Sequence, residues 1–229
     1  MDLVILQDQI AQCNGKAGDI IYWLWEIKFL ESIPREDWLT IIMKVFTYLG
    51  EGGAMWIVLS IVLAIFAKTR KTGFTMMISM IGAVIIGNVI LKNCFARFRP
   101  CWVISDTFNG TEFFNSIKYH ISIPNDYSFP SGHTMNGVTA SMSILFCTMK
   151  DKKKVFYGIG AVVLACIIAF SRMYLLVHWP TDIIAGAFVG LVIAIGSYII
   201  MDKKLWAVID KACTNLKKAI DRKKQNKIV

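Results

Sequence analysis

Three short stretches of this sequence carry residues that could bind and transfer a phosphate group. The first is KNCFARFRP, residues 92–100, in which two cations, Lys92 and Arg99, stand seven residues apart. If a helix continues to Arg99, that spacing is about two turns, so both side chains point to one side and can hold two oxygens of a dianion. Pro100 then ends the helix, because a proline disfavours helical backbone in the residue before it.

The second stretch is FPSGHT, residues 129–134, at the entrance to an apolar segment. Ser131 is a favourable N-cap residue, and Gly132 lets a ligand approach the backbone closely. The free N–H groups of a starting helix form an anion site. His133, with an ordinary pKa of about 6.5, is suited to proton transfer beside it. Taken alone, the stretch is equally typical of a plain helix start.

The third stretch is SRMYLLVHWPTD, residues 171–182, which adds a further cation, Arg172. Pro180 favours a helix start at residues 179–180, and this places Asp182 in the first turn, where the helix dipole stabilises a carboxylate. Asp182 can accept a hydrogen bond from one imidazole nitrogen of His178 and leave the other nitrogen free to attack. Viewed alone, Asp182 also fits an ordinary helix-start residue.

Together these residues predict an anion pocket with a His–Asp nucleophile, a second histidine as acid and three cations. Phosphoryl transfer fits this set, and no metal or other cofactor is needed to neutralise the charge. The six cysteines form no C-x-x-C pair and no Cys/His ligand spacing, so they do not indicate a metal site.

The elements that position these residues are predicted to be membrane-spanning helices. Hydrophobic residues make up 55% of the chain and charged residues 18%, below the roughly 25% usual for soluble domains. Five uncharged segments are long enough, or nearly so, to cross a bilayer. They are 52–67, 72–91, about 130–149, 155–171 and 183–201. The predicted fold is therefore an all-α integral membrane helix bundle.

Both ends of the chain are expected to lie outside this core, within a single domain of 1–229. Residues 19–33 and 36–49 are aromatic and amphipathic but carry charges, so they favour interfacial helices within a 1–49 region. A sixth, N-terminal span remains an alternative. Residues 50–201 form the transmembrane core, and 202–229 form a basic tail with a helical pattern.

The distribution of charge predicts the orientation. The net charge is +9, and Lys/Arg clusters at 68–71, 150–154 and 203–227 follow the first, third and fifth spans. All three clusters therefore fall on one face, which the positive-inside rule makes cytoplasmic. This arrangement accounts for most of the basic surplus and argues against nucleic-acid binding. The tail could also bind the anionic inner leaflet.

The three chemistry-bearing stretches fall on the opposite, extracytoplasmic face. Ionisable residues beside a hydrocarbon core are costly and indicate a site, although snorkelling Lys and Arg anchors explain any one of them equally well. Arg97 is interpreted as an accessory headgroup contact or a membrane anchor. His120 is interpreted as a surface residue.

The three stretches together resemble the signature of the type 2 phosphatidic acid phosphatase superfamily. Its K-x6-R-P part matches Lys92, Arg99 and Pro100. Its P-S-G-H part matches 130–133. Its S-R-x5-H-x3-D part matches Ser171, Arg172, His178 and Asp182. Each part alone is a weak signal, but all three occur in order with unbroken spacing.

The resemblance implies a role for each matched residue. His178 attacks phosphorus to form a phosphohistidine, Asp182 orients His178, and His133 protonates the leaving oxygen. The implied phosphate ligands are Lys92, Arg99, Arg172, the Ser131 hydroxyl and the Gly132 backbone N–H. Water then hydrolyses the intermediate without a metal.

The predicted function is a membrane lipid phosphatase acting on a polyprenyl diphosphate, phosphatidylglycerophosphate or phosphatidate. The small size resembles the bacterial undecaprenyl pyrophosphate phosphatase group and implies a multi-pass protein of the bacterial plasma membrane. A lipid phosphotransferase with the same site, or an anion transporter or channel, remains an alternative. The sequence leaves open the preferred lipid, the oligomeric state and whether Cys94 and Cys101 are bonded.

Overall fold

The computed structural model describes residues 17–101, 122 and 124–225, and within them every regular element is helical. The helices are α2 (Ala17–Ser32), α3 (Asp37–Leu49), η1 (Glu51–Gly53), α4 (Ala54–Ile65), α5 (Arg70–Ala83), η2 (Val84–Leu91), α6 (Lys92–Phe95), α9 (Gly132–Thr148), α10 (Val155–Tyr174), α11 (Pro180–Ile200), η3 (Met201–Leu205) and α12 (Trp206–Gln225). The prediction of an all-α helix bundle is confirmed.

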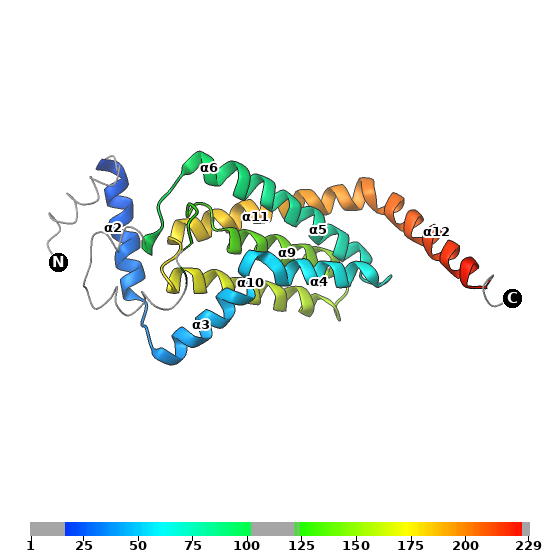
Figure 1. The fold of residues 1–229 in the computed structure, drawn as a ribbon, viewed down its shortest axis with the longest axis horizontal. Helices are drawn as coiled ribbons and strands as arrows, with labels where there is room; N and C mark the ends of the chain where they lie inside the picture. The colour runs from blue at the N-terminus through cyan, green and yellow to red at the C-terminus, as the bar shows by residue number, and fades with distance from the viewer. Residues whose placement is uncertain (1–16, 102–121, 123, 226–229) are drawn as a thin grey trace.

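The long helices lie side by side around α9, as Figure 1 shows. α9 packs against α10, α11 and α5, while α4 packs mainly on α5. α2 lies across one end of the bundle, at the left of Figure 1. α12 projects beyond the opposite end. The two ends of the bundle therefore differ in what surrounds them.

Four helical stretches are long and apolar enough to cross a membrane. They are Asp37–Ile65, Arg70–Phe95, Val155–Tyr174 and Pro180–Arg222. The predicted spans 52–67, 72–91, 155–171 and 183–201 fall almost entirely within them. The remaining predicted span corresponds to α9, which has 17 residues and is not among the four. The number of spans therefore stays a prediction.

α9 lies between its neighbours and buries several hydroxyl side chains. Its buried hydroxyls are satisfied locally: Thr139 donates to the Asn136 carbonyl at 2.9 Å, and Ser143 donates to the Thr139 carbonyl at 2.7 Å. Ser143 also lies 2.9 Å from the Ser79 hydroxyl on α5. Such bonds let polar side chains occupy the interior of a membrane bundle.

A glycine brings α11 against the start of α9. A Cβ on Gly186 would stand 2.7 Å from the carbonyl oxygen of Ser131, closer than real Cβ contacts. Small residues at such crossings let helix backbones approach closely in lipid. This contact sets the start of α9 beside the first turns of α11, and these two segments carry the second and third motifs.

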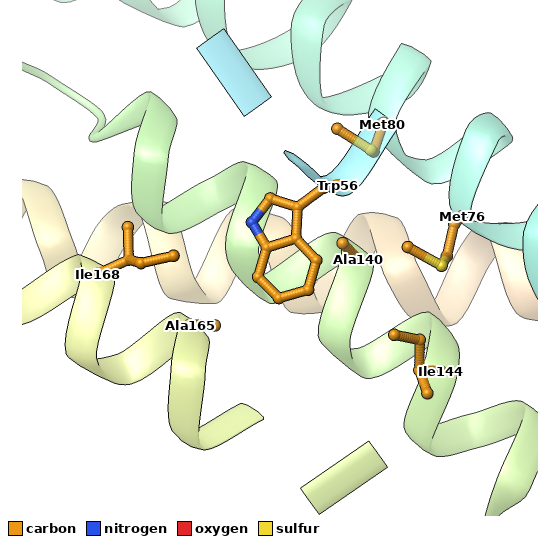
Figure 2. Close-up of a cluster of buried hydrophobic side chains, with 7 residues drawn as sticks. All are labelled: Trp56, Met76, Met80, Ala140, Ile144, Ala165 and Ile168. Carbon is orange, nitrogen blue, oxygen red and sulfur yellow. The ribbon is translucent and has the colours of Figure 1, made fainter. Parts of the chain in front are cut away.

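The apolar core lies inside the bundle, between α4, α5, α9 and α10. Figure 2 shows the indole of Trp56, from α4, at the centre of a buried cluster. The other members are Met76 and Met80 from α5, Ala140 and Ile144 from α9, and Ala165 and Ile168 from α10. The core therefore fixes α9 against three other helices and leaves the outer surface of the bundle to lipid.

Of the two N-terminal helices predicted to be amphipathic, α3 has this pattern, whereas the apolar residues of α2 do not gather on one face. α3 turns Thr40, Met43 and Thr47 inward, and Thr40 lies 2.8 Å from the hydroxyl of Tyr174 on α10. Its other face exposes large apolar side chains, including Trp38. The predicted break at GEGG is the short turn η1, where Gly52 has a φ of 58° that side-chain-bearing residues rarely adopt.

Candidate active site

All three motifs meet at the end of the bundle that α2 crosses. Backbone hydrogen bonds tie their segments together. Ser128 N donates to the carbonyl of Arg97 at 2.8 Å, and Ser131 N donates to the carbonyl of Asp182 at 3.1 Å. Residues from α6, the start of α9 and the α10–α11 connection thus form one site, although they lie far apart in the sequence.

His178 and Asp182 form the centre of this site. His178 is 1% exposed, and its Nδ1 lies 3.5 Å from Asp182 Oδ2. The same oxygen accepts the backbone N–H of Trp179 at 2.9 Å, because α11 begins at Pro180 as predicted. On the other side of the ring, Arg99 Nη1 lies 3.2 Å from His178 Nε2.

These contacts indicate which imidazole nitrogen of His178 carries the proton. A guanidinium can only donate, so Nε2 accepts from Arg99 and is unprotonated. The proton is then on Nδ1, facing Asp182. Burial lowers the pKa of His178 well below its usual value, and the charges of Arg99 and Arg172 lower it further. His178 is therefore a neutral base with its free nitrogen toward the cations.

Lys92 and Arg99 come together by a different route from the predicted one. The helix does not continue to Pro100: it ends at Phe95, and Ala96 adopts a left-handed backbone with a φ of 44°. The expectation of one continuous helical face is thus wrong. The turn instead folds the chain back, and both cations bind the same carboxylate, Asp126.

Asp126 is a member of the site that the sequence reasoning missed. Its Oδ1 accepts from Arg99 Nη2 at 2.5 Å, and its Oδ2 pairs with Lys92. Burial raises the pKa of Asp126, but the hydrogen bond from Lys92 and the charge of Arg99 outweigh it, and the pKa falls to about 2. An ionised carboxylate therefore holds the two predicted phosphate ligands. In the sequence, Asp126 could have been noticed only as an acidic residue a few positions before the second motif.

Arg172 is held by a residue of the N-terminal region. Its side chain is 4% exposed, and its Nη1 donates to Thr47 Oγ1 of α3 at 2.5 Å. Its Nε has no hydrogen-bond partner within the described part of the chain. Arg172 thus keeps one donor available for an anion. Thr47 lies outside every motif, so nothing in the local sequence indicated this contact.

The second motif begins α9 as predicted. Ser131 is the N-cap, and its Oγ accepts from Thr134 N at 3.4 Å and from Thr134 Oγ1 at 3.0 Å. Gly132 is the first helical residue. His133 Nε2 lies 3.5 Å from Glu51 Oε2 in η1 and has no hydrogen-bond partner among the described residues. Glu51 was also not anticipated.

Arg97 occupies a position that the sequence did not indicate. Its guanidinium pairs with the buried carboxylates of Asp182, at 2.7 Å, and Glu26, at 2.5 Å. The interpretation as a membrane anchor is wrong, because an anchor would direct its charge toward headgroups. His120 lies outside the described residues. Cys94 and Cys101 are not joined to each other by a disulfide.

Metal ligands do not cluster in the described ranges: no group of three or more His, Cys, Asp or Glu side chains there is arranged to hold an ion. The site is instead rich in cationic donors. The fold and these side chains together define a helical protein with a cluster of cationic side chains and two histidines at one end of the bundle.

Comparison with known proteins identifies the family. Residues 72–206 match the PAP2 superfamily, and the chain belongs to it. It is 35% identical over 136 residues to the undecaprenyl-diphosphatase of Sulfolobus acidocaldarius, covering 59% of this chain and 58% of that protein. It is 30% identical over 166 residues to phosphatidylglycerophosphatase B of Bacillus subtilis, covering 69% of this chain and 73% of that protein. The match thus spans less than two thirds of the Sulfolobus protein.

Solved structures share the fold. The PAP2 type phosphatidylglycerolphosphate phosphatase from Bacillus subtilis superposes with a TM-score of 0.63 at 22% identity, over 88% of this chain and 95% of that one. LpxE from Aquifex aeolicus gives a TM-score of 0.54 at 24% identity, over 71% of this chain and 87% of that one. The predicted family and the predicted helical membrane fold are both confirmed.

Proposed function

We propose that this protein is a membrane lipid phosphatase that works through a phosphohistidine on His178. The observation that carries the proposal is the position of this buried histidine: its Nδ1 lies 3.5 Å from Asp182 Oδ2, and its Nε2 lies 3.2 Å from Arg99, a predicted phosphate ligand. A neutral nucleophile next to donors that stabilise a dianion is the arrangement that phosphoryl transfer requires.

The first chemical step begins when the substrate phosphate replaces Asp126 on Lys92 and Arg99. His178 Nε2 attacks phosphorus, and the bond from phosphorus to the leaving oxygen breaks. His133 gives its proton to that oxygen. The imidazole of His178 becomes positively charged, and the carboxylate of Asp182 stabilises it.

The second step regenerates the enzyme. Water attacks the phosphorus of the phosphohistidine while His133, now neutral, takes one of its protons. The N–P bond breaks, and its electron pair returns to His178 Nε2. Inorganic phosphate leaves, and Asp126 can rebind the two cations. The residues in the site supply every proton transfer in this sequence without a metal.

An apolar groove supports a lipid substrate. A cavity of about 410 Å³ lies between α4 and α5, lined by Ile and Met side chains together with Gly52 and Asn136. Gly52 follows Glu51, which faces His133, and Asn136 lies one turn below His133 on α9. A hydrocarbon chain in this groove would place its headgroup at the site. Relatives named for undecaprenyl diphosphate and phosphatidylglycerophosphate agree with this class.

We further propose that the site faces the extracytoplasmic side of a plasma membrane. The basic clusters at 68–71 and 150–154 and the tail lie at the bundle end away from the site, at the right of Figure 1. The positive-inside rule assigns that end to the cytoplasm. Cysteine labelling of single-cysteine variants in intact cells tests this orientation.

Phosphate release by the purified protein tests the function. Polyprenyl diphosphate, phosphatidylglycerophosphate and phosphatidate are supplied in micelles containing EDTA, and wild type is compared with His178→Ala and with the control His120→Ala. We expect activity in wild type and in the control, and a loss of at least about 1,000-fold in His178→Ala. Full activity of His178→Ala would falsify the assignment.

Two additions to this assay separate the mechanistic alternatives. Rapid quenching with radiolabelled substrate should trap an acid-labile, alkali-stable phosphoprotein in wild type and none in His178→Ala. Adding a competing alcohol distinguishes hydrolysis from phosphotransfer, since a transferase would form a new phosphate ester. Activity that EDTA removes and a divalent ion restores would overturn the metal-free mechanism.

A further inference from the structure

A buried acid from the N-terminal helix α2 reaches the third motif. Glu26 is fully buried, although it lies outside the 72–206 region that matches the family. Its Oε1 accepts the backbone N–H of Thr181 at 3.0 Å and the Thr181 hydroxyl at 2.6 Å. Its Oε2 pairs with Arg97 Nη2 at 2.5 Å. A carboxyl side chain buried with this many partners is held in one position.

Arg97 connects this acid to the aspartate of the proposed nucleophile. Its Nη1 donates to Asp182 Oδ1 at 2.7 Å and to Thr181 Oγ1 at 2.6 Å. Its guanidinium also lies over the ring of Trp179, 5.3 Å from the centroid. The planar fork therefore binds a carboxylate on each side, and an arginine suits this task better than a lysine does.

The two oxygens of Asp182 are held by different partners. Oδ1 is held by Arg97, while Oδ2 accepts the N–H of Trp179 and faces Nδ1 of His178. Rotation of the carboxylate would break both contacts at once. Arg97 thus fixes the plane of the group that orients the histidine, and Glu26 fixes Arg97.

We propose that Glu26 and Arg97 are positioning residues that act on the reaction through Asp182. The inference rests on the proposed phosphatase function. It makes α2 a part of the active site rather than only a membrane-surface helix. The competing explanation is that the two residues only hold α2 against the bundle. Substituting them would then lower kcat by the same factor in wild type and in the Asp182→Asn variant.

A double-mutant experiment separates these explanations. Glu26→Gln and Arg97→Met are each made in wild type and in the Asp182→Asn variant, and radiolabelled phosphate release gives kcat and KM. In wild type we expect kcat to fall about tenfold for Glu26→Gln and about tenfold or more for Arg97→Met, with KM changed by less than about twofold. In Asp182→Asn, each further loss should be less than about twofold, because residues acting through one group are not additive.

Controls keep a folding defect apart from a positioning defect. Glu31→Gln removes an exposed acid from the same helix and should leave kcat unchanged. Arg97→Lys keeps the charge but loses the bidentate fork, so it should lower kcat less than Arg97→Met. Thermal unfolding in detergent verifies that each variant is folded. If Arg97→Met does not fold, Glu26→Gln and Arg97→Lys carry the test.

Each outcome bears on the inference. Equal losses in wild type and in Asp182→Asn would show a purely structural role and overturn it, as would wild-type kcat in both single variants. If Asp182→Asn has no measurable activity, a fall in kcat at unchanged KM and unchanged unfolding temperature supports the inference, and a fall that tracks the unfolding temperature overturns it. Failure of the proposed function is distinguishable, because wild type would then release no phosphate.

Discussion

The two ends of the helix bundle carry the same kinds of charged residues in opposite settings. At the end crossed by α2, Arg99, Arg172 and Asp182 are buried, although Asp126, the carboxylate that pairs with Arg99, is 54% exposed. At the other end, the Lys71–Asp202 pair joins the start of α5 to η3, with side chains 29% and 46% exposed. Water and salt screen such exposed pairs, whereas buried charges interact strongly and are costly to leave unpaired.

The difference separates orientation from chemistry. The exposed cations at one end can set the membrane orientation by their number alone, because the positive-inside rule counts Lys and Arg regardless of their contacts. The buried cations at the other end need definite partners, because in the proposed mechanism each presents a donor to the substrate. Substitutions at the end with the buried cations should therefore lower kcat/KM by orders of magnitude more than substitutions at the other end, and this contrast can be tested.

The largest effect is expected for the buried cation Arg172. Arg172→Ala removes the available Nε donor and leaves Thr47 without its partner. We expect kcat/KM for lipid phosphate hydrolysis to fall about 100- to 1,000-fold, the scale of one lost donor to a developing charge. Initial rates of phosphate release measure it, and a loss of less than about threefold would contradict the role.

A second prediction concerns Asp126, the carboxylate that pairs with both Lys92 and Arg99. Asp126→Asn removes the charge that pairs with Lys92 and Arg99 and that, in the proposed mechanism, the substrate phosphate must replace. We expect KM, and the inhibition constant of inorganic phosphate, to fall about three- to tenfold. Asp151→Asn, an exposed acid at the opposite end, is the matched control. A rise in KM would show instead that Asp126 helps to build the site.

The pH dependence gives a third prediction. A lowered pKa keeps His178 neutral at pH values where an ordinary imidazole, with a pKa of about 6.5, is already protonated. On the acid side, activity should therefore persist down to about pH 6.5, and the acid limb of kcat/KM should lie below that value. Asp126, with a pKa of about 2, stays ionised throughout and adds no limb. An acid limb above the ordinary value would contradict this account.

The smallest effect is expected at the opposite end. Lys71→Ala breaks the exposed pair with Asp202 and removes a cation lying near the rings of Tyr198 and Trp206. We expect kcat/KM to stay within about twofold of wild type. Phosphate release and thermal unfolding check this together. A tenfold loss of activity would mean that the two ends are coupled through the bundle.

The convergence of the motifs could be predicted because it depends on local rules. Pro180 and Asp182 predicted the start of α11, and Ser131 predicted the start of α9. The alternation of the predicted spans then put both helix starts at the same end of the bundle. The resulting proximity of His178 and Asp182 follows from a spacing of four residues at a helix start.

The partners of these residues could not be predicted, because they come from distant segments. Thr47 meets Arg172, and Glu26 meets Thr181, across more than a hundred residues of sequence. In sequence, Glu26 and Asp126 look like ordinary polar residues. The turn at Ala96 was equally hidden, since alanine normally favours a helix and Pro100 offered a later stop.

The buried polar character of α9 has a consequence for how the protein is made. A segment with so many Thr, Ser and Asn side chains is held in the bilayer less by its own hydropathy than by the helices that enclose it. It would therefore enter the membrane most easily as a hairpin with α10, its neighbour in sequence and in space. Since α9 begins at Gly132, with Ser131 as its N-cap and His133 in its first turn, the proposed site is completed only when that hairpin has docked against α5 and α11. A half-assembled chain then lacks a complete site.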